Sequence, residues 1–530
     1  MHAKPSDTDV ESGQASGRHA LWLAVLAPAL ALFLGLIALS VYASTPLSIA
    51  GYADFSFGDT VTDEPTAIMA ESKVWWNDGY WWGVLYNDAA GAYHIYRLDA
   101  SQQEWIDTGV AADERPESRA DVLWDDSTQR LYVASHSKIE NPSPPNSSSA
   151  NWARLYRYSY DANANTYSLD TGFPAPDVNK YRTESLVFDK DSTGRLWATW
   201  VGRTISDTYE VYVSYSAGDD LTWSDAYALP FPTEGAVDVD DISSLIAFTD
   251  DSGPQIGVMW SNQQDGHFHF ATHPDSSDPE SDWTLDSNFE AAVTVPADDH
   301  MDFATTSNGE LFMSVKTGID PQTQPGEPLI GVVARESDGA TTFIEVAPGD
   351  SRDTRPIVVV DESSSELYLF SVSKSGGDAV CRFTAAITSP LSDMNFLADN
   401  CSPPNGEPPN SPAALANLID AEVFIGDTQT YTQTNNPTST KQRVTDVTGV
   451  LVLASDDLQS YYLHNLAGGE LPTPEDTPTP TATATQGPTA TPTSTATPSP
   501  TATMAPTETP TSGPPPQADE FLYLPYIAGP

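Results

Sequence analysis

The stretch YRTESLVFDKDSTGRLWATW, residues 181–200, decides the fold. It opens with polar residues, continues into a run with apolar side chains at alternate positions, turns at Asp189–Gly194 and ends in a second alternating run that contains two Trp residues. Such alternation is typical of a half-buried strand, and a short segment of Asp, Ser, Thr and Gly is typical of a hairpin turn. The stretch therefore predicts two antiparallel strands.

The same hairpin pattern recurs along the chain. Its copies occupy residues 72–86, 119–135, 184–200, 242–260, 301–315 and 355–372, with a weaker copy at 443–455. Further strand-like segments follow most copies, for example residues 93–99 and 104–109 after the first. A repeated unit of four antiparallel strands is typical of the blades of a β-propeller, a closed ring that protects its sheet edges.

The repeats therefore predict an all-β fold, a β-propeller of four-stranded blades, over residues 50–470. Seven blades are expected, or six if the weak last copy joins a neighbouring blade. That copy has a third strand at 461–466 but no obvious fourth. Residues 52–58 (YADFSFG) could supply the missing strand and close the ring. We expect no helix among the repeats.

The N-terminal segment predicts export. Residues 1–19 are polar and expected to be cytoplasmic, whereas residues 20–43 carry no charge and are long enough to cross a bilayer as a helix. Val41–Ala43 also fits the small-residue rule for cleavage before Ser44. A transmembrane anchor and a cleaved signal peptide both remain open. Either one predicts an extracytoplasmic protein, at the cell surface or secreted, and anchored in the membrane if the helix is retained.

The C-terminal segment differs from the repeats in composition. Residues 471–518 consist largely of Pro, Thr and Ala, which cannot bury enough apolar surface to fold, so we expect a disordered stalk. Residues 519–530 form a short apolar tail that cannot span a membrane.

The charge of the chain excludes one class of partner. There are 74 acidic residues against 23 Lys and Arg, which gives a formal net charge of −51. Affinity for nucleic acid comes from Lys and Arg, so no nucleic-acid partner is expected. Like charge keeps such proteins dispersed, and we expect a monomer. The two cysteines, Cys381 and Cys401, predict a disulfide in an exported protein.

Two partial motifs resemble the Asp boxes of the sialidase-like propeller superfamily, which read Ser-x-Asp-x-Gly-x-Thr-Trp. SAGDDLTW (Ser216–Trp223) keeps the Ser, Thr and Trp, and SDGATTF (Ser337–Phe343) is a shorter copy. An Asp box fixes a turn through hydrogen bonds to the backbone, so it indicates fold and not activity. The FRIP motif of sialidases is absent. The tail FLYLPYIAGP resembles those that follow Pro/Thr stalks in exported proteins of filamentous phototrophic bacteria and their relatives, which implies surface attachment or processing.

The geometry of a propeller predicts where ligands bind. Each innermost strand begins, and each second strand ends, on the face that holds the central pocket. The starts of the innermost strands carry Lys73, Arg119, Asp121, Glu184, Asp241, Asp299, His300, Asp302, Arg355, Lys441 and Gln442. The ends of second strands carry His136, Arg203, Asn262, Gln263 and Lys316. Basic residues at four of seven entries of so acidic a chain favour an acidic or heavily hydroxylated ligand, such as a glycan.

Each of these residues has two interpretations. Arg119 and Arg355 could hold a ligand carboxylate, with Arg203 as a third member by analogy with the sialidase arginines, or could form ion pairs that seal the ring. Glu184 next to Tyr181 resembles a carboxylate-assisted Tyr nucleophile, with Asp241 or Asp299 as proton donor.

Other residues suggest a lyase or a cation. His300 or His136 could act as the base in an elimination on uronate sugars, with Arg119 neutralising the carboxylate, as in seven-bladed polysaccharide lyases. No metal or cofactor is otherwise expected. Asp189–Gly194 could bind calcium but fits a hairpin turn better.

Three classes of function remain open. The first is a non-catalytic propeller that binds a glycan in a charged axial pocket, with Lys73, Asp121, Asn262, Gln263, Lys316 and Lys441 among its ligand-binding residues. The second is an enzyme, either a sialidase-type glycoside hydrolase or a uronate polysaccharide lyase. The third is a protein-interaction platform, which would show an apolar patch on one face. The missing FRIP motif and the degenerate Asp boxes favour binding.

Overall fold

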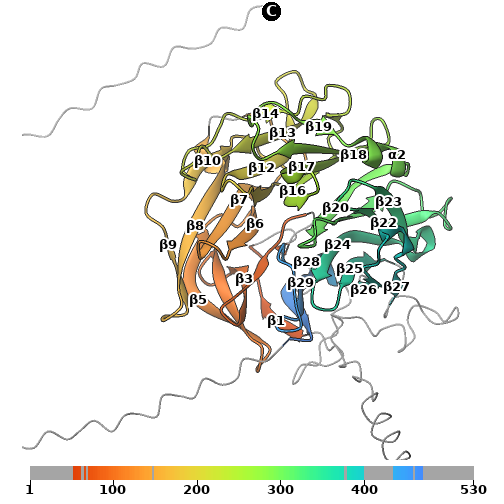
Figure 1. The fold of residues 1–530 in the computed structure, drawn as a ribbon. Coiled ribbons are helices and arrows are strands. Elements are labelled where there is room, and N and C mark those ends of the chain that lie inside the picture. The colour runs from red at the N-terminus through yellow and green to blue at the C-terminus, as the bar shows by residue number, and fades with distance from the viewer. Residues whose placement is uncertain are drawn as a thin grey trace, which may run out of the picture. The chain divides into compact units, whose positions relative to one another are not determined.

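A computed structural model describes residues 52–60, 65–66, 70–145, 148–374, 379–398, 434–456 and 460–469. These residues form seven antiparallel sheets of four strands, two of which carry a fifth strand, arranged as blades in a ring (Figure 1). The predicted seven-bladed β-propeller is confirmed. Among the described residues, no helix is long and apolar enough to cross a membrane. The predicted anchor, stalk and tail lie outside them.

The blades follow one another along the chain. The first blade contains β2 (Val74–Asn77), β3 (Tyr80–Asn87), β4 (Ala92–Asp99) and β5 (Glu104–Asp113). The second contains β6 (Ser118–Asp125), β7 (Arg130–Ser137), β8 (Ala153–Asp161), β9 (Thr166–Leu169) and β10 (Ala175–Asn179). The third contains β11 (Val187–Lys190), β12 (Leu196–Arg203), β13 (Tyr209–Tyr215), β14 (Tyr227–Ala228) and β15 (Ala236–Val237). The fourth blade contains β16 (Ser243–Asp250), β17 (Gly253–Asn262), β18 (His267–Pro274) and β19 (Thr284–Leu285). The fifth contains β20 (Ala297–Thr305), β21 (Leu311–Thr317), β22 (Pro328–Arg335) and β23 (Thr341–Pro348). The sixth contains β24 (Asp353–Asp361), β25 (Glu366–Ser373), β26 (Ala379–Ala386) and β27 (Leu397–Ala398). The seventh contains β28 (Thr434–Thr438), β29 (Val450–Asp456), β30 (Tyr461–Ala467) and β1 (Tyr52–Ser56).

The hairpin of residues 181–200 forms as its sequence predicts. β11 pairs with β12, and the turn between them is organised by Asp191. Its Oδ1 atom accepts hydrogen bonds from the backbone N–H groups of Thr193 and Arg195, both at 2.9 Å, while Gly194 takes the positive φ of 90° that the turn requires. Oδ2 accepts a hydrogen bond from Trp197 Nε1 at 2.9 Å, which fixes the buried indole ring.

The ring closes with a strand from the other end of the chain. β1 pairs antiparallel with β30, with Tyr52 opposite His464, so the predicted closing strand is confirmed. In Figure 1 the orange-red strand β1 and the blue strand β29 belong to this last blade, and β30 lies between them in the sheet. The seventh and first blades are also joined by the hydrogen bond from Lys73 N to Ser439 O at 3.3 Å.

Two expectations about elements are corrected. The first strand of the last blade is β28, Thr434–Thr438, and not the segment that begins at Arg443; there, Val444 makes only an isolated bridge to Asp361. A short helix, α2 (Ser287–Ala292), occurs although none was expected. It begins because the Asp286 side chain accepts hydrogen bonds from the N–H groups of Asn288 and Phe289, and it buries Phe289.

Both partial Asp boxes lie where a third strand turns into a fourth. Ser216–Trp223 connects β13 to β14, and Asp219 accepts hydrogen bonds from the N–H groups of Leu221 and Thr222. Ser337–Phe343 covers the turn after β22 and the first three residues of β23, and Asp338 accepts a hydrogen bond from Ala340 N at 2.9 Å in that turn. The two motifs therefore serve as turns.

The core lies between the faces of neighbouring blades. The aromatic residues of the first blade illustrate it: Trp75, Trp81 and Trp82 are buried, and of the two Trp pairs only Trp76 is half-buried. This burial removes most of them from contact with a ligand. The five exposed large apolar side chains found among the described residues lie in five different blades: Ile106, Leu169, Ile205, Leu397 and Val447.

Candidate functional site

A basic pocket lies between the fifth and sixth blades, on the face where β20 and β24 begin. Its volume is about 360 Å³. It is lined by Lys316 of β21, by Arg352 and Arg355 around the start of β24, and by Lys374 after β25, together with His300 of β20. Asp320, Gln322, Asp353 and Thr354 add polar groups, and Pro321 and Leu329 add apolar ones. We call this cavity the basic pocket.

Both arginines of the basic pocket lie on irregular backbone. Arg352 and Arg355 have left-handed φ angles of 56° and 53°, which residues other than glycine seldom adopt. The pairing of β24 with β25 shifts register between Thr354 and Ile357, as in a β-bulge. Residues three apart in a regular strand face opposite sides, whereas a bulge redirects side chains. The irregularity therefore lets both arginines line one cavity.

A second irregular strand brings three ionisable residues together. Asp298, Asp299 and His300, the acid–histidine cluster, lie at the start of β20, where the register with β21 shifts between Ala297 and Met301. A ligating atom from each lies within 4.8 Å of the others. His300 Nδ1 is 2.6 Å from Asp299 Oδ1 and 3.2 Å from Asp298 Oδ1. Lys316 Nζ is 2.6 Å from Asp298 Oδ2.

The carboxylates of this cluster favour a charged imidazole. Burial alone would lower the pKa of His300, but the adjacent Asp299 and Asp298 outweigh it and raise that pKa above 6.5. Hydrogen bonds of His300 and Asp299, together with the charge of Lys316, in turn hold the pKa of Asp298 well below its usual range, against the effect of burial. The two carboxylates therefore favour the protonated form of His300, which lies at the edge of the basic pocket.

Glu184 is buried in an unfavourable environment. Only 7% of the residue is exposed, and its Oε2 atom is buried without a hydrogen-bond partner. Burial, followed by the negative charges of Asp299 and Asp240, raises the pKa of this carboxyl from 4.5 to about 8. Glu184 precedes β11, Asp240 precedes β16 and Asp299 lies on β20, so the entries of three consecutive blades converge here.

The predicted pairing of Glu184 with Tyr181 is not seen. The Tyr181 ring packs against Trp200 and Tyr212, with ring centroids 5.9 and 5.0 Å apart, and its hydroxyl hydrogen-bonds to Tyr212. The structure therefore places Tyr181 in the core of the third blade.

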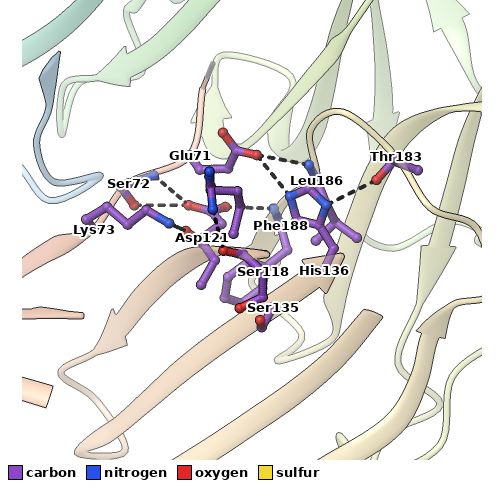
Figure 2. A network of polar contacts seen from close by, with 12 residues as sticks. Glu71, Ser72, Lys73, Ser118, Asp121, Ser135, His136, Thr183, Leu186 and Phe188 are labelled. Carbon is purple, nitrogen blue, oxygen red and sulfur yellow. Dashed lines mark hydrogen bonds and ion pairs between the residues drawn. The ribbon is translucent and has the colours of Figure 1, made fainter. Parts of the chain in front are cut away.

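Four other predicted residues lie in a buried network between the first three blades (Figure 2). Lys73 Nζ donates to Ala120 O at 2.5 Å, and burial lowers the pKa of Lys73 to about 7. Arg119 is 3% exposed and donates to Ser118 O at 2.8 Å. Asp121 accepts from Ser72 N at 2.9 Å and from Phe188 N at 3.0 Å.

His136 completes this network. It is fully buried, with Nε2 3.2 Å from Glu71 Oε1 and Nδ1 3.4 Å from Thr183 Oγ1. Figure 2 shows Glu71 directed towards the imidazole ring. The network joins neighbouring blades, but the hydrogen bonds of Arg119 go to Ser118 O and the Tyr93 hydroxyl and not to a carboxylate, so its role as a ring-sealing ion pair stays a prediction. Because these side chains are buried, the site proposed below does not include them.

Three further predicted residues support a turn at the fourth blade. Asp241 Oδ2 accepts from Asp238 N at 2.6 Å, and Oδ1 accepts from Gln263 N at 3.1 Å. Asn262 Nδ2 donates to Glu234 O and Ala236 O, both at 3.1 Å. Burial raises the pKa of Asp241 to about 6, although these hydrogen bonds oppose it.

Arg203 and Lys441 lie in different places. Arg203 forms an exposed ion pair with Asp207 in the turn between β12 and β13. Lys441 lines a second cavity of about 390 Å³, formed by the innermost strands, where it bonds to the Asp121 carboxylate and to Phe188 O. This axial cavity is lined largely by strand residues such as Val122, Leu245 and Phe303. The axial cavity also carries Lys190 and Arg443, opposed by three acids, Asp126, Asp189 and Asp302. The basic pocket has four Lys and Arg residues opposed by two acids, so the larger excess of positive charge lies between the fifth and sixth blades.

Comparisons with known proteins add similarity of structure alone. No family model matches the sequence, and no curated protein matches it. The structure is similar to polysaccharide lyase Uly1 (11% identity, 79% of this chain and 97% of that chain, TM-score 0.40). It is also similar to a PL25 ulvan lyase (11% identity, 78% of this chain and 96% of that chain, TM-score 0.45). A third similar structure is the Hadza microbial sialidase Hz136 (12% identity, 72% of this chain and 74% of that chain, TM-score 0.37). With identities and TM-scores this low, none of the three is evidence for an activity of this chain.

Several residues of the site were not predicted from the sequence. Lys374 lies directly after the second strand of its blade, and Lys316 lies at the end of the second strand of the neighbouring blade, so the rule that found Lys316 could have found Lys374. No such signal marks Arg352 or Asp298, because each reaches its neighbours from a connecting segment or beside a register shift.

Two predictions remain untested. At Asp189–Gly194 the side-chain oxygens of Asp189 and Asp191 accept hydrogen bonds, for example from Ala247 N to Asp189 at 2.8 Å, and calcium binding there stays a prediction. Cys381 is buried in β26, whereas Cys401 lies outside the described residues, so their disulfide also stays a prediction.

Proposed function

We propose that the protein is an exported propeller that binds an anionic glycan in the basic pocket. One observation carries this proposal: four of the 23 Lys and Arg side chains of a chain with net charge −51 line a single cavity, together with His300. Arg presents several N–H donors in a planar fork that suits carboxylates and sulfates, and Lys adds point charge. A volume of about 360 Å³ lies within the range of small-ligand sites.

The contacts of His300 favour binding over elimination. Its Nδ1 atom lies 2.6 Å from the Asp299 carboxylate, which raises the pKa of the imidazole, whereas a general base has to be neutral. Hydrolysis and lysis remain alternatives because Glu184, with its pKa of about 8, could donate a proton at neutral pH. The scattered exposed apolar residues give no support to a protein-interaction platform.

Export is part of the proposal on the strength of the sequence. The apolar segment 20–43 would anchor or direct the chain, and the Pro/Thr-rich segment 471–518 would act as an extended spacer. We propose that the propeller works outside the cytoplasm, where polysaccharides with uronate or sulfate groups are available ligands.

The test compares two matched double variants on arrays of acidic, sulfated and neutral glycans. Arg355→Ala/Lys374→Ala removes two pocket cations, and we expect a loss of affinity of about 30-fold or more for the anionic glycan, since hydrogen bonds to charged groups contribute about 1.5–3 kcal/mol each. Arg130→Ala/Lys180→Ala removes the same charges from the second blade and should leave affinity unchanged.

Equal binding by both double variants, at equal folded content by circular dichroism, would overturn the proposal. The same glycans are incubated with the wild-type protein, and their cleavage products are analysed by mass spectrometry. Cleavage would show that the protein is an enzyme and not a binding protein. An unsaturated product would then indicate a lyase, and a product that has gained water would indicate a hydrolase.

A further inference from the structure

His300 has one buried ring nitrogen without a partner. Nε2 makes no hydrogen bond and the residue is 8% exposed, whereas Nδ1 lies 2.6 Å from Asp299 Oδ1 and 3.2 Å from Asp298 Oδ1. Buried polar atoms in proteins are nearly always hydrogen-bonded, and an exception calls for an explanation. Because the His300 ring lines the basic pocket, a ligand in that pocket can supply the missing partner.

The two carboxylates determine which nitrogen of His300 can gain or lose a proton. An ionised carboxylate only accepts hydrogen bonds, so the ring donates from Nδ1 and keeps a proton there. A second proton can then bind only at Nε2. With that proton, Nε2 donates a hydrogen bond and the ring is a cation. Without it, Nε2 is an acceptor, which disfavours the oxygen atoms of an anion.

We propose that Nε2–H of His300 donates a hydrogen bond to the anionic group of a glycan in the basic pocket, so that the affinity falls when the ring loses this proton. This inference rests on the proposed function, because it concerns the same pocket and the same class of ligand. The group bound is a carboxylate or a sulfate, whose oxygens form stronger hydrogen bonds with a charged donor than neutral oxygens do. The Lys and Arg side chains of the pocket keep their charge near neutral pH, so the loss of one donor should weaken binding without abolishing it.

Other charged groups lie around His300 and affect the pH dependence. The basic pocket adds Lys316 and Asp320 from the fifth blade and Arg352, Asp353, Arg355 and Lys374 from the sixth, and Glu184 and Asp240 precede the innermost strands of the third and fourth blades. Burial lowers the pKa of His300, but Asp299 and Asp298 outweigh it and raise that pKa above 6.5. Burial raises the pKa of Asp353 to about 6, and burial with the charges of Asp299 and Asp240 raises that of Glu184 to about 8. These two carboxyls therefore titrate in the same range and need controls.

The experiment measures the affinity of the full chain for two anionic probes by isothermal titration calorimetry, from about pH 6 to about pH 9. A galacturonate oligosaccharide carries only carboxylates, a sulfated dextran oligosaccharide carries only sulfates, and unmodified dextran is the neutral control. For the probe that binds, we expect the affinity of the wild type to fall about tenfold or more as pH rises, because the charge-assisted hydrogen bond is lost. The probe that shows this fall identifies the anionic group.

Two variants change the titrating ring in different ways. His300→Gln keeps a neutral amide donor but cannot be protonated, so it should bind the anionic probe about tenfold more weakly than the wild type at about pH 6 and lack the fall due to His300. Asp299→Asn removes the carboxylate nearest Nδ1, which should lower the pKa of His300 and move the fall in affinity to lower pH. A purely structural role of His300 would not produce this shift.

The controls separate His300 from the other titrating groups. Glu184→Gln and Asp353→Asn each remove one of them and should keep the fall in affinity. His94→Gln is the matched control, because Nδ1 of His94 also lies 3.0 Å from a carboxylate, that of Asp107, but in the first blade. Circular dichroism confirms that each variant is folded. The same pH dependence in the wild type and His300→Gln would overturn this inference alone, whereas no binding of either anionic probe at any pH would overturn the proposed function as well.

Discussion

Glu184 links the stability of the propeller to pH. In the folded protein this carboxyl keeps its proton up to a pKa of about 8, because of burial and its acidic neighbours, whereas an unfolded chain loses the proton near 4.5. The folded state therefore binds more protons between these values, and the free energy of unfolding falls as pH rises through them. Glutamine cannot ionise, so Glu184→Gln removes this loss.

We expect the free energy of unfolding of Glu184→Gln, relative to the wild type, to rise by about 2–4 kcal/mol from pH 5 to pH 8.5. Urea unfolding at the two pH values measures it. Glu104→Gln, exposed on β5, should show no such trend. A difference from wild type that stays constant with pH would mean that Glu184 is ionised in the folded protein.

The sequence predicts which residues lie at the strand entries, but not the direction in which each of their side chains points. The rule that an innermost strand begins on the pocket face grouped Arg355 with His300, and both line one cavity, but this is the basic pocket between two blades and not the predicted axial cavity. The same rule included Lys73 and Arg119, which the structure buries between blades. Which neighbours a side chain meets at a strand entry depends on the local register and on bulges, and neither follows from the alternation of apolar residues.

Carboxylates that accept backbone hydrogen bonds link the innermost strands of neighbouring blades. Asp121 of β6 accepts from Phe188 N of β11, Asp189 of β11 accepts from Ala247 N of β16, and Asp302 of β20 accepts from Val358 N of β24 at 3.1 Å. Each carboxylate thus bridges to the following blade. Burial raises the pKa of Asp302 to about 7, so part of this ring of acids is protonated near neutral pH.

Asp121 provides the test of this tie. Its fully buried side chain accepts hydrogen bonds from the first and third blades and bonds to Lys441, so Asp121→Asn leaves the lysine without its partner. Removing one member of a buried ion pair costs about 3–5 kcal/mol, and we expect a loss of about 3 kcal/mol in the free energy of unfolding.

Urea unfolding of Asp121→Asn, Lys441→Met and the double variant measures the coupling of the pair. The double variant should lose less stability than the sum of the single variants, because neither charge is then left alone. Strict additivity would show that the two side chains act independently, and that the tie depends on the backbone hydrogen bonds.

The elements with strong apolar alternation were predicted well, and the polar ones were not. The hairpin of residues 184–200 forms as expected, whereas β28 has the sequence TNNPT, which contains no large apolar residue. It pairs because β29 is fully buried beside it and the other six blades leave that place in the ring. Tertiary context of this kind overrides local preference. Likewise, the cap that starts α2 is too short a signal to predict a six-residue helix.

At the scale of the whole molecule, the charge distribution sets the conditions for binding. A net charge of −51 repels an anionic glycan at long range, and the basic pocket attracts it only within about a Debye length, roughly 8 Å at physiological salt. The local cations can therefore act only where the surrounding acids are screened or paired, as Asp298 is with Lys316 and His300.

The integrity of the ring depends on β1, which is contributed by the N-terminal side of the propeller. The buried side chain of Asp54 on β1 makes a hydrogen bond of 2.7 Å with His464 Nδ1, and Phe55 stacks on Tyr96 with ring centroids 4.9 Å apart. A chain that begins at Thr60 lacks β1, leaves His464 without its carboxylate and exposes the edge of β30.

We expect this truncated chain to lose about 4 kcal/mol or more of its free energy of unfolding and to associate through the exposed edge. Urea unfolding and analytical ultracentrifugation measure the two effects. A chain that begins at Thr45, close to the predicted cleavage position, keeps β1 and should match the full chain. A synthetic peptide of residues 52–58, added to the truncated chain, should restore part of the lost stability. If the chain that begins at Thr60 is as stable and monomeric as the one that begins at Thr45, three strands suffice for the last blade, and closure depends on the contacts between the innermost strands.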